Sequence, residues 1–415
     1  MRKPDPVAPD APVAAPADRF TLDGDAAVEA RVAADQAVIA QAVAGLVPAQ
    51  HFAALVLMGG YGRGEGGYVQ GEQGPAPFND YDYFVVVRGM GRGARAALAL
   101  GLAALAETLA GQVGVAVDFA LLRQETLARA EFSLMNAEMQ WGHRVLAGER
   151  DVLARMPHMP FHALPHGELT RLMLNRGTLL LMNQQRLLER RSGGAASGAE
   201  TGLDPGERQR FFKYLMKAVR ACGDTRLAAA GLYHPSYAEK LARLEAPRPE
   251  RTVDAAEGLD PMPHHDDFLE LYRLAHRHKF HPAYEEFAGE QAAEWLARVL
   301  RIWKATLYAF EIRRLGFGFA HWHDYCRADV RKGQRGNLVR NVGVTVRDFG
   351  ARELLRRPRR SLYYPRERLI AALPLLLTEP GSPIDPCAAS ALGLPSPSHW
   401  QPASERYLGL WAKYA

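Results

Sequence analysis

Cysteine is scarce in this chain of 415 residues, and its three cysteines, Cys222, Cys326 and Cys387, stand far apart. They form no CxxC pair and no zinc-ligand spacing, so neither a disulfide framework nor a zinc module is expected. This usage is typical of a reducing compartment. We therefore expect a cytoplasmic protein.

Long hydrophobic runs are also missing. No stretch approaches about 18 uninterrupted apolar residues, so we expect no membrane span and no membrane partner. The N-terminus has basic residues at positions 2 and 3 but lacks the apolar segment of a signal peptide. Pro, Ala and Asp dominate this region, and we expect residues 1–25 to be a disordered leader.

A strong charge of one sign is the third absence. The net charge is +5 and the pI is about 9.1. Such a mild excess permits an anionic ligand without requiring nucleic acid. Hydrophobic residues make up 48% and charged residues 23%, which is ordinary for a soluble globular protein.

Helical and strand-like patterns alternate over the first part of the chain, which predicts an α/β layer in residues 26–158. Gly and Pro occur six times after Gly64 within 64–78, which we interpret as a loop. The predicted helices span 26–47, 93–112 and a piece of 123–140. The predicted strands span 52–58, 81–87, 113–121 and 143–147.

The rest of the chain is predicted to be helical, which makes the fold class α+β. This helical domain is expected over 159–385, with an irregular basic segment within 321–368 and a C-terminal tail at 386–415. A Gly/Ser/Ala-rich linker is expected at 191–202. The predicted helices span 167–191, 206–230, 265–279, 289–315 and 363–377.

Two glycines follow the first predicted strand. Gly59 and Gly60 end the apolar run FAALVLM, which fits a buried strand and a tight turn. Because glycine has no side chain, its backbone N–H group can approach an anion closely. This turn is therefore a candidate phosphate cradle.

Three aspartates lie in or beside the next predicted strands. Asp80 and Asp82 are two residues apart, and a strand places such residues on one face. Asp118 is flanked by apolar residues in another strand that we expect to be buried, where an ionised carboxylate needs a partner or a metal. Converging carboxylates beside a glycine turn predict a hard-cation site that also holds phosphates.

The segments GGYGRGE (59–65) and NDYDYFVVV (79–87), followed by Asp118, resemble the nucleotidyltransferase superfamily that shares its palm with DNA polymerase β. The local likeness is to the box of the PII uridylyltransferase group. Asn79 stands where that group has Ser. The HD and ACT modules of the PII enzymes are not recognisable. The resemblance covers about residues 50–150 and implies an N-terminal palm followed by an all-α domain.

The resemblance also implies roles for the residues of the box. Gly59 and Gly60 would hold the triphosphate, and Arg63 and Glu65 would complete the nucleotide-binding helix start. The three aspartates would bind Mg²⁺, with Mn²⁺ as the alternative. Asp118 would in addition activate the acceptor hydroxyl.

One face of a later helix carries further candidates. Lys213 and Lys217 are four residues apart and share that face with Arg220 and Asp224. Turned toward the palm, they would neutralise the triphosphate. A solvated stripe with an ion pair is an equal alternative. In the next segment, His234 and Tyr237 could stack on a base or pack under the turn.

Two other clusters are less specific. The run from His264 to Asp267 looks like metal ligands, but a capped helix start is the favoured interpretation. Residues 327–368 contain 13 Arg or Lys against 4 Asp or Glu, including RRPRR at 356–360 before Tyr363 and Tyr364. Nucleic acid could bind there, although a solvated surface is favoured.

We therefore expect an ATP- or other NTP-binding, magnesium-dependent transferase. It would move a nucleoside monophosphate onto an acceptor hydroxyl of a small molecule or protein and release pyrophosphate. One alternative is a non-catalytic nucleotide sensor or interaction protein. Another is a nucleic-acid-binding or RNA-end-modifying protein that uses residues 327–368.

Overall fold

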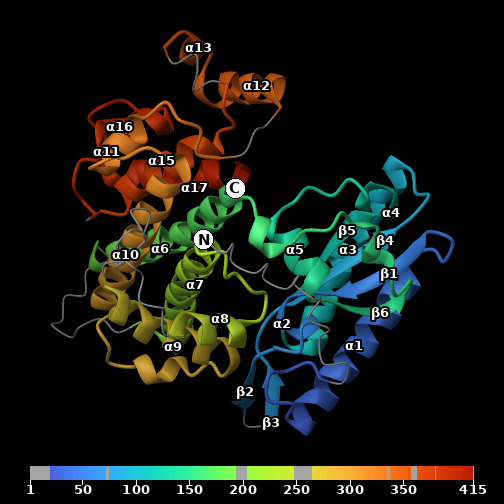
Figure 1. The fold of residues 1–415 in the computed structure, drawn as a ribbon. Helices are drawn as coiled ribbons and strands as arrows, with labels where there is room; N and C mark the ends of the chain where they lie inside the picture. Colours follow the sequence, from blue (N-terminus) through green and yellow to red (C-terminus); the bar gives the residue numbers. More distant parts are fainter. Residues whose placement is uncertain are drawn as a thin grey trace, which may run out of the picture. The chain divides into compact units, whose positions relative to one another are not determined.

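The structure is a computed structural model. It describes residues 19–71, 74–192, 203–246, 264–333, 337–356, 362–378 and 380–414 (Figure 1). The expected leader and the linker at 191–202 fall largely outside these ranges. The chain divides into two compact units. The first comprises Met1–Pro165, Gly231–Arg243 and His276–Ala283, and the second comprises His166–Ala230, Leu244–Ala275 and Tyr284–Ala415. The fold is α+β, with a small mixed sheet near the N-terminus and helices after it.

A four-stranded sheet forms the centre of the first unit, in the order β5-β4-β1-β6. Its strands are β1 (Phe52–Leu57), β4 (Tyr81–Val87), β5 (Val117–Arg123) and β6 (Arg144–Gly148). Strand β4 pairs in parallel with β5 and antiparallel with β1. The strands predicted at 52–58, 81–87 and 143–147 are confirmed to within a residue. The third strand starts later than predicted, because the preceding helix continues to Val113 and ends at Gly114 in the left-handed conformation.

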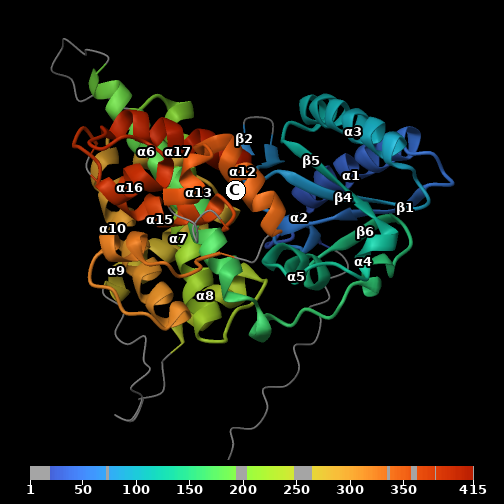
Figure 2. The same ribbon diagram turned by 90° about the horizontal axis from the view of Figure 1, so that it is seen from above.

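Two long helices cover one face of this sheet (Figure 2). They are α1 (Ala26–Leu46) and α3 (Arg92–Val113), close to the predicted 26–47 and 93–112. Among the described residues, α3 is the one helix long and apolar enough to cross a membrane by length and composition. Its leucines at 98, 102 and 109 are buried in the core that the sheet and α1 share. A helix that covers a sheet in a soluble protein has the same character.

The expected loop at 64–78 contains a short antiparallel hairpin, β2 (Tyr68–Gly71) and β3 (Gly74–Pro77). Both ends of this hairpin are held by the side chain of Tyr61, which precedes it in the chain. Tyr61 Oη donates a hydrogen bond to the carbonyl oxygen of Gly67 at 2.6 Å and accepts one from the backbone N–H of Phe78 at 3.2 Å. The glycines and prolines of this segment suggested a loop. The hairpin was not predicted, because the side chain that anchors its ends belongs to Tyr61, outside the segment.

Short helices complete the first unit. They are α2 (Gly59–Gly62), α4 (Gln124–Leu127), α5 (Leu134–Trp141) and the 3-10 turns η1 (Val152–Arg155) and η2 (Phe161–Ala163). Two later segments also belong to this unit: most of α8 (Tyr237–Glu245) and the last turn of α9 (His265–Phe280). The expected domain limit at residue 158 missed both segments.

The second unit is helical. The predicted helices at 167–191, 206–230, 265–279, 289–315 and 363–377 are confirmed with small shifts at their ends. The described part of the basic segment contains the helices α11, α12 and α13. The described part of the expected tail at 386–415 forms α16 and α17, which pack on α15, and α17 also packs on α6. The elements are α6 (His166–Ser192), α7 (Pro205–Ala229), most of α9, η3 (Tyr284–Phe287), α10 (Ala292–Leu315), α11 (Trp322–Arg327), α12 (Leu338–Phe349), α13 (Arg352–Arg356), α15 (Arg366–Leu376), α16 (Pro386–Leu392) and α17 (Trp400–Tyr414).

Candidate metal and nucleotide site

Three carboxylates come together on two neighbouring strands of the first unit. The parallel register of β4 and β5 places Asp82 opposite Asp118, and Asp80 directly precedes β4. One carboxylate oxygen from each residue lies within 4.8 Å of the others. Asp82 and Asp118 are exposed and Asp80 is half-buried. The arrangement is open to solvent and concentrates negative charge at one point.

The alternation of β4 sets the direction of these side chains. Tyr81 and Tyr83 point toward α1, where their hydroxyls donate to Asp35 at 2.9 Å and to Gln36 at 2.6 Å. Burial raises the pKa of both phenols well above the usual tyrosine value. Because successive strand residues point to opposite faces, Asp82 is directed to the face away from α1.

The expectation that Asp118 occupies a buried strand is wrong. Strand β5 is an edge strand, and Asp118 itself is exposed, while Phe119 is only half-buried. The apolar residues on either side of Asp118 suggested burial, but they pack on the opposite face of the sheet, toward α3. Its proximity to Asp82 thus comes from parallel pairing with β4.

The glycine turn lies directly beside these carboxylates. Gly59 has φ +66°, a left-handed conformation that suits glycine. A Cβ on Gly59 would lie 3.1 Å from Oδ2 of Asp82. The backbone N–H of Met58 also donates to the carbonyl oxygen of Asp82 at 2.8 Å. A side chain at position 59 would therefore press on the Asp82 carboxylate.

A lysine that the sequence analysis did not single out lies beside the second glycine. A Cβ on Gly60 would be 3.3 Å from Nζ of Lys279 and 2.9 Å from the carbonyl oxygen of Glu65. Lys279 belongs to the last turn of α9, which is part of the first unit. The ammonium group thus adds a positive charge beside the half-buried glycine turn.

Asn79 links this lysine to the aspartates. In one orientation of the amide, its Nδ2 donates to the carbonyl oxygen of Lys279 at 3.3 Å. In the flipped orientation, its oxygen instead accepts from Lys279 Nζ at 3.3 Å and from the backbone N–H of Gly67 at 3.2 Å. Asn79 adjoins Asp80 and stands at the position where the resembling family has Ser. The departure from the family pattern therefore coincides with a contact to α9. No short-range signal in the sequence pairs residues 200 positions apart.

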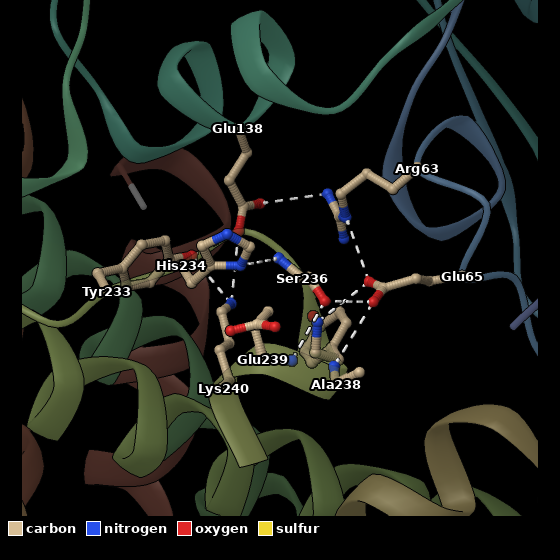
Figure 3. Close-up of polar contacts among 10 residues, drawn as sticks. Arg63, Glu65, Glu138, Tyr233, His234, Ser236, Ala238, Glu239 and Lys240 are labelled. Atoms are coloured by element: carbon tan, nitrogen blue, oxygen red, sulfur yellow. Dashed lines mark hydrogen bonds and ion pairs between the residues drawn. The ribbon is translucent and has the colours of Figure 1, made fainter. Parts of the chain in front are cut away.

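Arg63 and Glu65 have buried side chains and take part in a network of charges (Figure 3). The Arg63 guanidinium lies 3.8 Å from Glu65 and 4.0 Å from Glu138. Glu65 accepts hydrogen bonds from the Ser236 hydroxyl at 2.5 Å and the Tyr237 backbone N–H at 3.0 Å. These two residues thus connect the glycine turn with the segment that leads into α8.

Lys240 completes the network from α8. Its side chain is 0% exposed, and its ammonium group lies 3.0 Å from the Tyr233 hydroxyl and 3.6 Å from Glu138. Burial alone would raise the pKa of Glu138, but the charges of Lys240 and Arg63 outweigh it and lower that pKa. Glu138, Ser236 and Lys240 carry no local signal in the sequence, because each acts through contacts between distant segments.

Two further nucleotide-binding candidates belong to the second unit. Lys213 and Lys217 are half-buried on α7 in the second unit. Their role toward the triphosphate stays a prediction. The ring of Tyr237 faces Lys240 Nζ at 4.7 Å and Lys279 Nζ at 5.6 Å. The ring that was expected to stack on a base or to pack under the turn therefore makes cation–π contacts with two lysines of the chain.

The two less specific clusters are occupied by internal contacts. Asp267 pairs with Arg298 and Arg301, which favours the helix-start interpretation of that cluster over a metal site. In the basic segment, the ring of Tyr364 is covered by Arg340, whose guanidinium carbon lies 5.3 Å from the ring centroid. Residues 334–336 and 357–361, which include most of the RRPRR run, lie outside the described residues.

Comparison of the chain with protein-family models, with curated proteins and with solved structures found no match. The resemblance in residues 59–65 and 79–87 therefore stands on the local motif. Function has to be argued from the chemistry of the site.

Proposed function

We propose that the first unit is a nucleotidyltransferase palm, and that the protein transfers a nucleoside monophosphate from an NTP to an acceptor hydroxyl. One observation carries this proposal. The carboxylates of Asp80, Asp82 and Asp118 converge beside a glycine turn that also adjoins Lys279. Carboxylates suited to a cation thus lie beside Gly59, and an ammonium group suited to phosphate lies beside Gly60.

The donor set fits a hard divalent cation. Mg²⁺ prefers oxygen ligands and is held in many phosphate-transferring proteins by one or two carboxylates together with substrate phosphates. Three carboxylates within 4.8 Å repel one another unless a cation lies between them. When bound, Mg²⁺ or Mn²⁺ would neutralise phosphate charge and polarise the reacting phosphoryl group.

The chain's own residues would position and neutralise the substrate. Gly59 and Gly60 permit close approach of the triphosphate to backbone N–H groups. The ammonium group of Lys279 offsets the charge of the phosphates and of the departing pyrophosphate. Lys213 and Lys217 are further candidates for neutralising the charge of the triphosphate.

Asp118 would act on the acceptor. Its exposed carboxylate can accept the proton of the acceptor hydroxyl. The hydroxyl oxygen then bonds to the α-phosphorus, the bond from that phosphorus to the β-phosphate oxygen breaks, and pyrophosphate leaves. A small molecule or a protein is the favoured acceptor. The open position of β5 at the sheet edge supports either one, because solvent reaches Asp118 directly.

The test uses the full chain with each of the four NTPs labelled at the α-phosphate, Mg²⁺ or Mn²⁺, and cell extract as the source of acceptors. We expect label transfer and pyrophosphate release with at least one NTP. Asp82→Asn should lower the rate by about 100-fold or more. The exposed Asp151 provides a matched control, and Asp151→Asn should leave the rate unchanged. Absence of transfer with every NTP, or an equal rate in both variants, would overturn the proposal.

Asp118 separates an enzyme from a nucleotide sensor. Asp118→Asn should retain much of the NTP affinity, because Asp80 and Asp82 remain, but it should lose most transfer activity. Affinity is measured by calorimetry and transfer by the labelled product. If wild type binds NTP but never transfers it, and Asp118→Asn binds it equally, the sensor function is the correct one.

A further inference from the structure

A second cluster of reactive side chains lies in the second unit, on α11 and at the start of α16. His323 lies in the first turn of α11, and Asp385 and Cys387 lie at the N-terminal end of α16. The imidazole Nδ1 of His323 is 2.9 Å from a carboxylate oxygen of Asp385, and its Nε2 is 3.7 Å from Sγ of Cys387. These contacts join residues 62 to 64 positions apart in the sequence.

The three groups lie close together, with one ligand atom from each within 4.8 Å of the others. The carboxylate of Asp385 meets one ring nitrogen of His323 and the thiol of Cys387 meets the other. Asp385 is itself held in place, because its Oδ1 accepts the backbone N–H of Cys387 at 2.7 Å and caps α16. A carboxylate that orients a base, followed by the base and then a nucleophile, is the arrangement that activates a weak nucleophile.

The same three residues could also hold a metal ion, because one ligand atom from each lies within 4.8 Å of the others. The contacts of the imidazole favour an activated thiol. Asp385 lies at Nδ1, where a carboxylate orients a base, and Cys387 lies at Nε2, where the base takes the proton of a nucleophile. The metal site is an alternative that the second experiment tests.

The environment of Cys387 differs from that of the other two cysteines. Cys222 and Cys326 are buried, while Cys387 is half-buried and the His323 side chain is 38% exposed. Burial raises the pKa of the Cys222 thiol to about 12. The hydrogen bond to Asp385 raises the pKa of His323 above its usual value, outweighing burial, and the charge of Cys387 acts in the same direction. A protonated imidazole beside Sγ favours the thiolate form of Cys387.

We propose that Cys387, His323 and Asp385 form an activated-thiol site that exchanges with low-molecular-weight disulfides. The thiol proton moves to Nε2 of His323, and Sγ attacks one sulfur of the disulfide. The S–S bond of the small molecule breaks as a mixed disulfide forms on Cys387. The leaving thiolate takes the proton from the imidazole, so Cys387 is oxidised and one half of the small disulfide is reduced. A disulfide needs only an accessible thiolate for this reaction, whereas an acyl substrate would also need donors for an oxyanion.

The first experiment measures alkylation of the reduced full chain by iodoacetamide from pH 5 to 9, with peptide mass spectrometry to locate the label. Cys387 should be labelled first, with an apparent pKa below the value of about 8.5 for a free thiol. His323→Gln should slow labelling at pH 6.5 about tenfold. Asp385→Asn should have a smaller effect in the same direction, because asparagine can still cap the helix. His399→Gln removes an exposed histidine of the same unit and should change nothing.

The second experiment exposes the reduced protein to oxidised glutathione. A mixed disulfide should form at Cys387, should be absent in Cys387→Ser, and should form more slowly in His323→Gln. Two results would overturn the proposal. One is alkylation of Cys387 with the pH profile of a free thiol and no effect of His323→Gln. The other is stoichiometric zinc in the purified protein that is lost in Cys387→Ser, which would assign a metal site.

Discussion

The first unit contains two charged clusters that differ in composition and exposure. The open cluster, Asp80, Asp82 and Asp118, combines like charges at the solvent-exposed edge of the sheet. The closed cluster, Arg63, Glu65, Glu138 and Lys240, pairs opposite charges, and its Lys240 is fully buried. Buried charges are tolerated when they are paired, while carboxylates this close to one another favour binding of a cation among them. The closed cluster therefore stabilises the fold, whereas the open cluster is suited to bind a cation.

The glycine turn connects the two clusters. The backbone N–H of Glu65 donates to the carbonyl oxygen of Gly60 at 2.7 Å, and Gly59 lies against Asp82. A change in the closed cluster should therefore act first on stability, while a change in the open cluster should act first on binding and turnover. The following predictions test this division.

Glu138→Gln should give the largest loss of stability. It leaves the charges of Arg63 and Lys240 without their shared carboxylate, and breaking a buried pair costs about 3–5 kcal/mol. The Glu138 side chain is 26% exposed, so we expect about 2–3 kcal/mol less free energy of unfolding, measured by urea denaturation. Glu131→Gln, at an exposed glutamate just before α5, is the matched control. Equal stability of the two variants would contradict the role of the closed cluster.

The stability difference between wild type and Glu138→Gln should depend on pH. The pKa of Glu138 is lowered in the folded state, since Lys240 and Arg63 outweigh the opposing effect of burial. A carboxylate whose pKa is lowered by folding stabilises the protein at pH values above its unfolded-state pKa. This stabilisation is lost as the pH falls through the pKa of the folded state. The difference should be constant from pH 7 to about 5 and should shrink below about 4.5. A difference that grows at low pH would be inconsistent with this origin.

Lys279→Met should raise the KM for the NTP. It should destabilise the first unit less than Glu138→Gln does. Because the triphosphate is charged in both the ground and transition states, the change should appear mainly in KM. An increase of about tenfold corresponds to about 1.4 kcal/mol. Arg277→Met removes an exposed positive charge from the same turn of α9 and is the control. The same increase in both variants would indicate a general charge effect instead of a contact at Gly60.

Cation binding should stabilise the protein, and this gain should depend on the open cluster alone. Mg²⁺ or Mn²⁺ at ten times its Kd should stabilise wild type by about 1.4 kcal/mol in thermal unfolding. Asp82→Asn should remove this gain, whereas Asp151→Asn and Glu138→Gln should keep it, the latter from a lower starting stability. A gain that survives in Asp82→Asn would place the cation elsewhere.

Most of the longer helices and the strands of the four-stranded sheet could be predicted from local patterns, whereas α12, α16 and α17 lie in segments expected to be irregular or a tail. Strand β4 matches its predicted range, and the helices α6, α7 and α9 lie close to theirs. The hairpin at 68–77 and the late start of β5 were missed. The hairpin is anchored by the hydroxyl of Tyr61, and β5 starts late because α3 continues to Val113 and ends at Gly114.

The sequence by itself determined the glycine turn, the aspartates and the alternation that directs Asp82 away from α1. These features are local, because turn chemistry and strand periodicity act within a few residues. Only the tertiary structure decided that Asp118 lies exposed on an edge strand, that Lys279 adjoins Gly60, and that Arg63 is enclosed by residues of α5 and α8. Such contacts join segments about 200 residues apart, so packing decides them and sequence periodicity carries no information about them.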